Sequence, residues 1–167
     1  MQQRAGAGLD GDQAASGDAA YAAALRLLTV RARSQAELEQ RLGQRGFEAG
    51  AVAAALERLM AVGLVDDDAF AAALAESRAA RGMDAAAVAL ELRERGVDPA
   101  LAARKAGEAM PAEDRVERCR QVAEARLAQL GGLSPATQFR RLAAYLARRG
   151  YATEVIHSVV GDLLGFE

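Results

Sequence analysis

One ten-residue pattern occurs three times in the sequence, as LEQRLGQRGF at residues 38–47, VALELRERGV at 88–97 and LAAYLARRGY at 142–151. Each copy has two apolar residues four positions apart, followed by an arginine, a glycine and a bulky apolar residue. Residues four apart lie on one face of an α-helix, so each apolar pair is expected to point into a core. Glycine is typical of the position just past a helix, where the chain turns in a left-handed conformation. The pattern therefore predicts three helices that end in the same turn.

The bulky residue after each glycine also has a place in this turn. With glycine at C′, the second apolar residue falls at C3 and the bulky residue at C″, the two positions that touch in a Schellman turn. We expect this contact three times, between Leu42 and Phe47, Leu92 and Val97, and Leu146 and Tyr151. The arginine lies in the last helical turn, where a cation is favourable beside the negative end of the helix dipole.

Each of these motif helices is expected to have a helix before it and a helix after it. The preceding helices are predicted at residues 19–31, 67–81 and 112–130, and the following ones pass through Val52–Leu59, Leu101–Met110 and Val155–Leu164. The expected N-caps are Ser34 in the box Ser34-x-x-Glu37, Asp84, Asp98 before Pro99, Ser134 before Pro135, and Thr153. No alternating strand pattern occurs in the sequence.

This arrangement predicts an all-α fold of three tandem three-helix repeats. We place the repeats at residues 18–66, 67–110 and 111–167. Units of this size are too small to hold a core alone and must stack on their neighbours. Residues 1–17 are mostly Gly, Gln, Asp and Ala, which bury little apolar surface, so a disordered N-terminal tail is expected there.

The composition narrows the class of protein. The chain has 167 residues, a formal net charge of −2 and one cysteine, so a disulfide-stapled secreted domain is excluded. No apolar run approaches the roughly 20 residues of a membrane span, and the first residues lack a signal-peptide pattern. We therefore expect a cytoplasmic protein without membrane contact, in which any basic surface arises from uneven distribution of charge.

The residues that usually carry catalysis are sparse. His157 is the single histidine and lies beside apolar helix positions, and Cys119 falls on an apolar stripe, where it is expected to act as a small hydrophobe. The run Asp66–Asp68 is better interpreted as the capped start of a helix than as a magnesium site. No nucleophile, base and oxyanion site occur together. The sequence therefore predicts a protein that is not an enzyme and has no metal or cofactor.

Arginine is the residue that remains to be explained. The helix at residues 135–149 carries Arg140, Arg141, Arg148 and Arg149 and no acid, with Arg141, Tyr145 and Arg148 expected on its outward face. Two interpretations stay open: a solvated face balanced by acids on neighbouring helices, or contact with an acidic protein surface or a nucleic-acid backbone. Weaker candidates for partner binding are Arg26, Arg31 and Arg33 in the first repeat, and Arg78 and Arg81 in the second.

Several motifs follow one another along the chain in a specific order. They are Ala24–Arg33, the box Ser34-x-x-Glu37-Leu38, Leu42-x-x-Arg45-Gly46-Phe47, Gly63-Leu64-Val65-Asp66-Asp67-x-x-Phe70-Ala71 with Arg78, and Leu142-x-x-x-Leu146-x-Arg148-Arg149-Gly150-Tyr151. In this order of motifs the sequence resembles the RecX family of bacterial recombination regulators, from about residue 20 to the C-terminus.

The resemblance implies both a shape and a function. RecX proteins are elongated, curved molecules of three three-helix repeats that bind the RecA filament on single-stranded DNA. They inhibit its ATPase, strand-exchange and coprotease activities, restrain recombination and the SOS response, and need no cofactor. The expected partner is therefore RecA, bound by a monomer.

Two other functions remain open. The chain could bind DNA directly through its arginine-bearing helices, at least weakly, because small helical units also read DNA in other proteins. It could also be an inert helical scaffold, which would affect neither RecA nor DNA.

Overall fold

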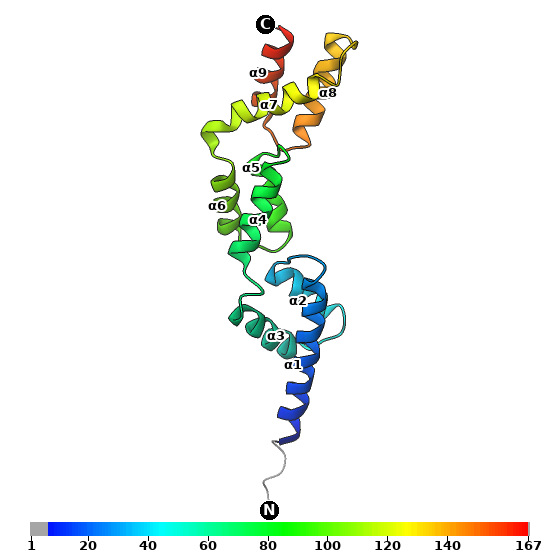
Figure 1. The fold of residues 1–167 in the computed structure, drawn as a ribbon, viewed down its shortest axis with the longest axis vertical. Coiled ribbons are helices and arrows are strands. Elements are labelled where there is room, and N and C mark those ends of the chain that lie inside the picture. The colour runs from blue at the N-terminus through cyan, green and yellow to red at the C-terminus, as the bar shows by residue number, and fades with distance from the viewer. Residues whose placement is uncertain (1–6, 167) are drawn as a thin grey trace, which may run out of the picture. The chain divides into compact units, whose positions relative to one another are not determined.

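The computed structural model describes residues 7–166, with side chains described from Ser16 onward, and is all-helical over that range (Figure 1). No strand occurs among these residues, and none of their helices is long and apolar enough to cross a membrane. The elements in chain order are α1 (Ala7–Leu28), α2 (Gln35–Gly43), α3 (Ala49–Ala61), α4 (Asp67–Ala79), α5 (Ala85–Glu94), α6 (Pro99–Ala109), the 3₁₀ turn η1 (Ala112–Asp114), α7 (Arg115–Leu127), α8 (Pro135–Ala147) and α9 (Thr153–Leu164). The all-α prediction is thereby confirmed.

Helix α1 begins earlier than the first predicted helix, which was placed at residues 19–31. The helix starts at Ala7, inside the stretch 1–17 for which a tail was expected. Residues 1–6 lie outside the described residues, so the prediction of disorder is not tested there. The repeat limits near residues 66 and 110 likewise stay predictions.

The motif turns have the geometry that the sequence predicts. Gly46, Gly96 and Gly150 have φ angles of 86°, 79° and 90°, in the left-handed region that glycine tolerates. In the first turn the Phe47 amide donates to the Leu42 carbonyl at 3.3 Å, and in the third the Tyr151 amide donates to the Leu146 carbonyl at 3.3 Å. These are the hydrogen bonds from C″ to C3 that define a Schellman turn.

The predicted helix caps are confirmed in part. The Ser34 hydroxyl accepts from the Glu37 amide at 3.1 Å, and Asp84 and Asp98 carboxylates accept from the first turns of α5 and α6. The assignment of Thr153 as a cap was wrong, since α9 already includes Thr153 and Ala152 occupies the cap position without a side-chain bond. An extended backbone at the cap position suffices to start this helix.

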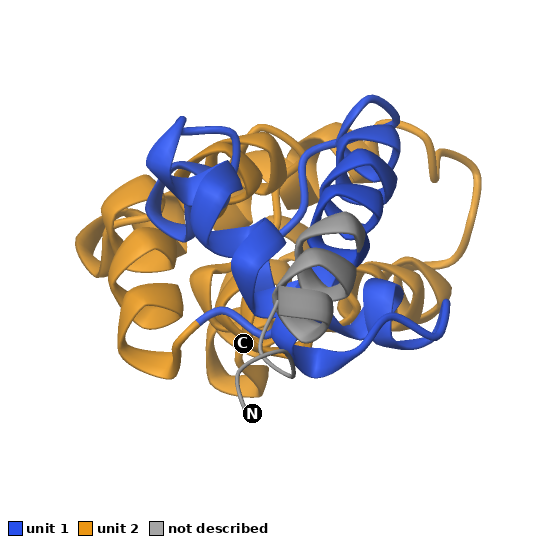
Figure 2. Cartoon of the chain, turned by 90° about the horizontal axis from the view of Figure 1, so that it is seen from below, with its two compact units in different colours: residues 1–70, 95–97 blue, residues 71–94, 98–167 orange. Residues whose placement is uncertain are grey.

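The chain divides into two compact units, coloured separately in Figure 2. The first runs to Phe70 and includes the turn Arg95–Val97; the second comprises residues 71–94 and those from Asp98 onward. Within the first unit, α1 and α3 pack around a core that includes Leu38, Leu42 and Leu59. Within the second, α7, α8 and α9 enclose a core of Cys119, Leu142, Leu146, Ile156, Val159 and Val160 with their neighbours.

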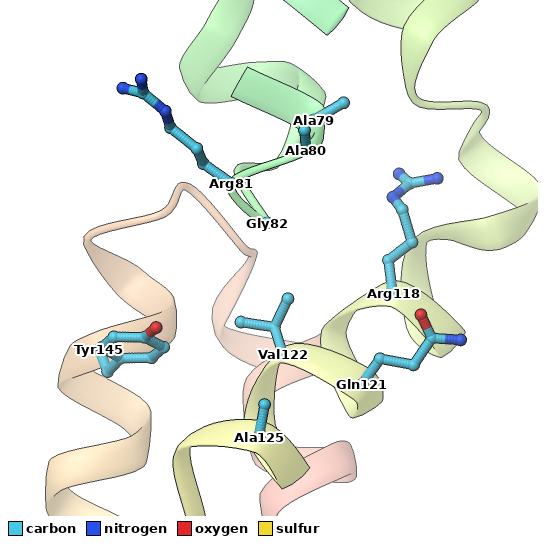
Figure 3. Close-up of a pocket in the computed structure, with 9 residues that line it drawn as sticks. All are labelled: Ala79, Ala80, Arg81, Gly82, Arg118, Gln121, Val122, Ala125 and Tyr145. Atoms are coloured by element: carbon cyan, nitrogen blue, oxygen red, sulfur yellow. The ribbon is translucent and has the colours of Figure 1, made fainter. Parts of the chain in front are cut away.

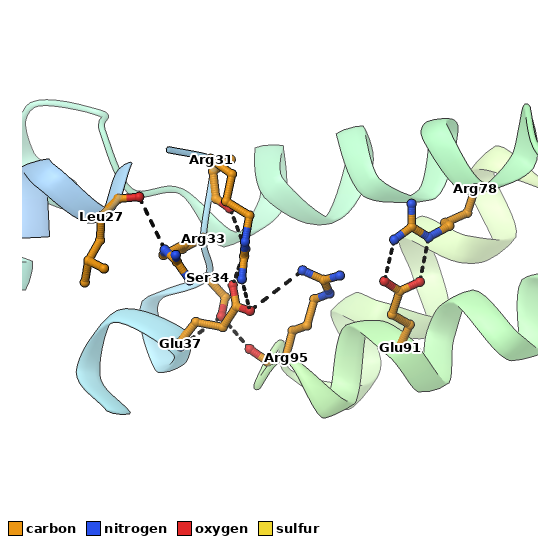
Figure 4. A network of polar contacts seen from close by, with 9 residues as sticks. Leu27, Arg31, Arg33, Ser34, Glu37, Arg78, Glu91 and Arg95 are labelled. Carbon is orange, nitrogen blue, oxygen red and sulfur yellow. Dashed lines mark hydrogen bonds and ion pairs between the residues drawn. The ribbon is translucent and has the colours of Figure 1, made fainter. Parts of the chain in front are cut away.

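The turn after α5 packs on the start of α2, inside the first unit. The Ser34 hydroxyl donates to the Arg95 carbonyl, which Figure 4 shows from close by. A side chain at Gly96 would collide with the Cβ of Ala36, in the first turn of α2. Ser34 is fully buried by this arrangement. The motif glycine is therefore needed for close approach as well as for its backbone angle.

The turn after α8 packs on the start of α5 in the same way, inside the second unit. The backbone amide of Asp84, the cap of α5, donates to the Arg149 carbonyl at 2.8 Å. A Cβ at Gly150 would lie 2.5 Å from the Cβ of Ala87 and 3.1 Å from its backbone nitrogen. Each of these two motif turns thus accepts a hydrogen bond from an earlier helix cap: Arg95 from Ser34, 61 residues before it, and Arg149 from Asp84, 65 residues before it. We call this arrangement a closed joint.

Candidate arginine surfaces

Two of the ten predicted site residues are held by carboxylates within their own units. Arg31 makes a two-pronged contact with Glu37, at 2.9 and 2.8 Å, and Arg78 makes one with Glu91, at 2.7 Å for both bonds (Figure 4). Paired guanidinium groups of this kind are constrained by their acids. In the structure, Arg31 and Arg78 therefore serve the packing of their units, and a partner would have to compete for them.

Arg26 and Arg33 differ from each other in exposure. Arg26 is exposed at the end of α1, and its side chain has no partner among the described residues. Arg33 is half-buried, and its Nε donates to the Leu27 carbonyl at 3.4 Å. Burial is the main cause that lowers the pKa of Arg33, and the positive charges of Arg31, Arg41 and Arg45 lower it further. The first repeat thus gathers like charges around Arg33.

Arg41 and Arg45 were not among the predicted site residues, although both are exposed and lie close enough to act on Arg33. Their spacing of four positions places them on one face of α2 and its turn, which was a signal available in the sequence. It was missed because Arg45 was interpreted as a cap of the helix dipole. A dipole cap and an exposed cation are not exclusive roles.

The α8 helix keeps most of its predicted basic surface. Arg140, Arg141 and Arg148 are exposed, and no carboxylate pairs with them among residues 16–166. We call these three residues the α8 arginine surface. The interpretation of α8 as a face balanced by neighbouring acids does not hold for these three side chains. They are free to meet an anionic partner.

Tyr145 and Arg149 belong to the core side of α8, contrary to the prediction that placed Tyr145 on the outward face. Tyr145 is half-buried and packs against the core of the second unit. The guanidinium carbon of Arg149 lies 3.7 Å from the centre of its ring, and that of Arg126 lies 5.2 Å from it. Both distances are typical of cation–π contacts. A helical wheel misplaced this tyrosine because α7 supplies a partner, Arg126, that the pattern of α8 does not contain.

Arg81 lies at the rim of a cleft in the second unit, shown in Figure 3. The cleft is lined by the end of α4, by Arg118, Gln121 and Val122 of α7, and by Tyr145. Figure 3 shows the Arg81 side chain projecting away from Val122 and Tyr145. Arg81 is exposed and has no ion-pair partner within the described part of the chain. The Arg81 side chain is therefore accessible to solvent and points away from the interior of the cleft.

Cys119 and His157, the two side chains most often used in catalysis, lie in structural positions. Cys119 is fully buried, and burial together with the charge of Asp84 raises its pKa to about 11, so the thiol stays protonated. His157 is exposed, and its ring meets Phe139 edge to face at 5.3 Å. Among the side chains of residues 16–166, no three His, Cys, Asp or Glu are placed to hold a metal ion. The arrangement of the described residues favours binding through exposed arginines.

Two family models match this chain. One describes the first three-helix domain of RecX and matches residues 20–59; the other describes the third three-helix domain of RecX and matches residues 112–160. The first match includes the turn at Gly46, and the second includes the turn at Gly150. The two family models thus cover the first and the third copies of the repeated pattern.

Curated relatives and solved structures agree with the models. The regulatory protein RecX of Thermobifida fusca is 37% identical, covering all of this chain and 94% of the relative. That of Mycolicibacterium smegmatis is 40% identical, covering 86% of this chain and 78% of the relative. A crystal structure of RecX from Lactobacillus salivarius has a TM-score of 0.71 at 19% identity, covering 90% of this chain and 97% of that one, which shows the shared fold. The chain therefore belongs to the RecX family of regulatory proteins.

Proposed function

We propose that this protein binds the RecA filament on single-stranded DNA and inhibits its ATPase, strand-exchange and coprotease activities. The proposal combines family membership with one observation in this chain, the α8 arginine surface of Arg140, Arg141 and Arg148. Binding without chemistry also fits relatives that are named regulatory proteins. In this proposal the protein acts in the cytoplasm, restrains recombination and the SOS response, and needs no cofactor.

The α8 arginine surface suits an acidic partner for a physical reason. Arginine offers several N–H donors in a planar fork, which matches carboxylate or phosphate groups better than a point charge does. Arg140 and Arg141 lie on α8 and Arg148 at its C-cap, and this helix carries no acid in a protein whose formal net charge is −2. Such local charge raises the rate of encounter with an acidic partner as well as its affinity.

The test is the ATPase activity of RecA on single-stranded DNA, measured against increasing amounts of this protein. We expect the wild type to lower the rate, and Arg141→Glu with Arg148→Glu to raise the half-inhibitory concentration about tenfold or more, since each 1.4 kcal/mol of lost binding is a factor of ten. An undiminished ATPase rate with saturating wild-type protein would contradict the proposed function.

The matched control is Arg93→Glu with Arg104→Glu, which changes the net charge by the same amount on α5 and α6. Both arginines are exposed in those helices. Circular dichroism should show unchanged helicity for both double variants. If the control weakens inhibition as much as the α8 variant, the effect comes from net charge, and the α8 arginine surface is not the contact.

Direct binding to DNA is the second candidate, favoured by the same three unpaired arginines. Three phosphate contacts on a single strand would give a slope of log affinity against log salt of about −2, because each contact contributes about −0.7. The measurement is fluorescence anisotropy of a labelled oligonucleotide in the absence of RecA. No detectable affinity at low salt would exclude this function.

A further inference from the structure

The motif turn of the first repeat has the same Arg-Gly pattern as the two turns that form closed joints. It is open, which means that no described helix packs on its glycine. Arg45 and Gly46 are both exposed, and a Cβ added at Gly46 would meet no described atom within 4 Å. By contrast, Gly96 and Gly150 lie against Ala36 and Ala87. Among the described residues, no helix cap packs on the turn at Gly46.

The last motif helix has the complementary open end. Its cap segment Ser134-Pro135-Ala136 has the same Ser-x-Ala pattern as Ser34-Gln35-Ala36, which receives the turn of Gly96. Ser34 is fully buried, whereas Ser134 and Ala136 are exposed. The Ser134 hydroxyl meets only the Thr137 hydroxyl, at 2.9 Å, and makes no cap bond to the backbone.

We propose that the open turn at Arg45–Gly46 docks on the open cap at Ser134–Ala136 of a second copy of this chain. The Ser134 hydroxyl would donate to the Arg45 carbonyl, as Ser34 donates to that of Arg95, and Gly46 would pack on Ala136 as Gly96 packs on Ala36. Both contacts repeat a joint that the chain already forms within the first unit. The two surfaces are different, so the association is head to tail. This inference does not depend on the proposed function.

Charge sets the strength of the intermolecular joint. In the joint of the first unit, Arg95 lies 3.7 Å from Glu37, the third residue after the cap. The corresponding residue after Ser134 is the uncharged Thr137, and Arg140 and Arg141 follow one turn later. Like charges near Arg45 weaken the contact, and salt screens that repulsion. The association is therefore weak and becomes stronger as ionic strength rises.

Sedimentation velocity over a range of protein and salt concentrations tests the proposal. The weight-average mass of the wild type should rise above that of the 17.5 kDa chain with concentration, and rise further with salt. Gly46→Asn blocks one end, because asparagine tolerates the left-handed backbone while its side chain occupies the joint. Ala136→Trp blocks the other end at an exposed helix position.

Mixing the two blocked variants distinguishes a head-to-tail joint from other association. Each variant alone should stay monomeric, and their equimolar mixture should form a dimer and nothing larger, since one intact pair of ends remains. Ala144→Trp, at an exposed position further along α8, is the matched control and should associate as the wild type does.

Three results would overturn the proposal. They are a wild-type mass that does not rise with concentration, single variants that still form chains, and a mixture that stays monomeric. If the wild type stays monomeric while Gly46→Asn loses binding to RecA, the open turn contacts RecA in place of a second copy. All variants should first be shown to keep the wild-type circular dichroism spectrum.

Discussion

The turns at Gly46 and Gly150 have the same sequence pattern and the same backbone, yet different surroundings. Both glycines have a φ angle near 90°, and both turns carry the same Schellman hydrogen bond. Only Gly150 lies against another helix, where it meets Ala87 and its turn accepts a bond from Asp84. The motif therefore encodes a helix ending, and the closed joint is a second use of the same turn. Substitutions at matched positions separate the two contributions.

The largest expected difference comes from alanine at the two glycines. Gly150→Ala should lower the free energy of unfolding by about 3 kcal/mol, because backbone strain at positive φ adds to overlap with Ala87. Gly46→Ala should cost only about 1 kcal/mol, since it has the strain without the overlap. Urea unfolding followed by circular dichroism measures both. Equal losses would mean that the joint contributes nothing beyond the backbone angle.

A second pair of variants isolates the contact in the joint of the first unit. Gly96→Ala should be destabilising because its Cβ meets that of Ala36, and Ala36→Gly removes the atom it meets. In a double-mutant cycle the combined loss should be smaller than the sum of the single losses by about 1–2 kcal/mol. Strict additivity would show that the two positions do not touch in solution.

The helix caps give the third contrast. Ser34→Ala should cost about 1–2 kcal/mol, because the buried hydroxyl both accepts from Glu37 and donates to Arg95. Ser134→Ala should cost about 0.5 kcal/mol or less, as its exposed hydroxyl makes no bond to the backbone. Thermal unfolding compares them. A loss at Ser134 as large as that at Ser34 would mean that the open cap is already covered.

The smallest effect concerns pH. Burial tends to raise the pKa of Glu37, but hydrogen bonds from Arg31 and the charges of Arg31 and Arg95 lower it below its ordinary value of 4.5. A carboxyl whose folded pKa is lowered contributes stability above about pH 4.5, which is lost as pH falls through the folded pKa. Glu37→Gln should therefore reduce stability at pH 7 and flatten its decline in acid. Identical pH profiles for variant and wild type would contradict this role.

The candidate surface was only partly predictable from the sequence. The exposure of Arg140, Arg141 and Arg148 followed from helical periodicity on α8, and the structure leaves them unpaired. The partners of Arg31 and Arg78 were not predicted, because Glu37 reaches Arg31 across a turn and Glu91 reaches Arg78 from the next helix. Periodicity assigns a residue to one face of its own helix and carries no information on the neighbouring helix.

The sequence by itself determined the helices, their turns and the repeat. Apolar residues four apart, caps and glycines act over a few residues, so their effect is local and readable along the chain. Only the tertiary structure decided which copies of the Arg-Gly turn are closed and which arginines are free. Those outcomes depend on Ser34 meeting Arg95 and Asp84 meeting Arg149, contacts between distant residues that form only when the repeats stack. The same local signal therefore has one role at Gly46, where it ends a helix. At Gly150 it has two roles, because it ends a helix and also joins that repeat to an earlier one.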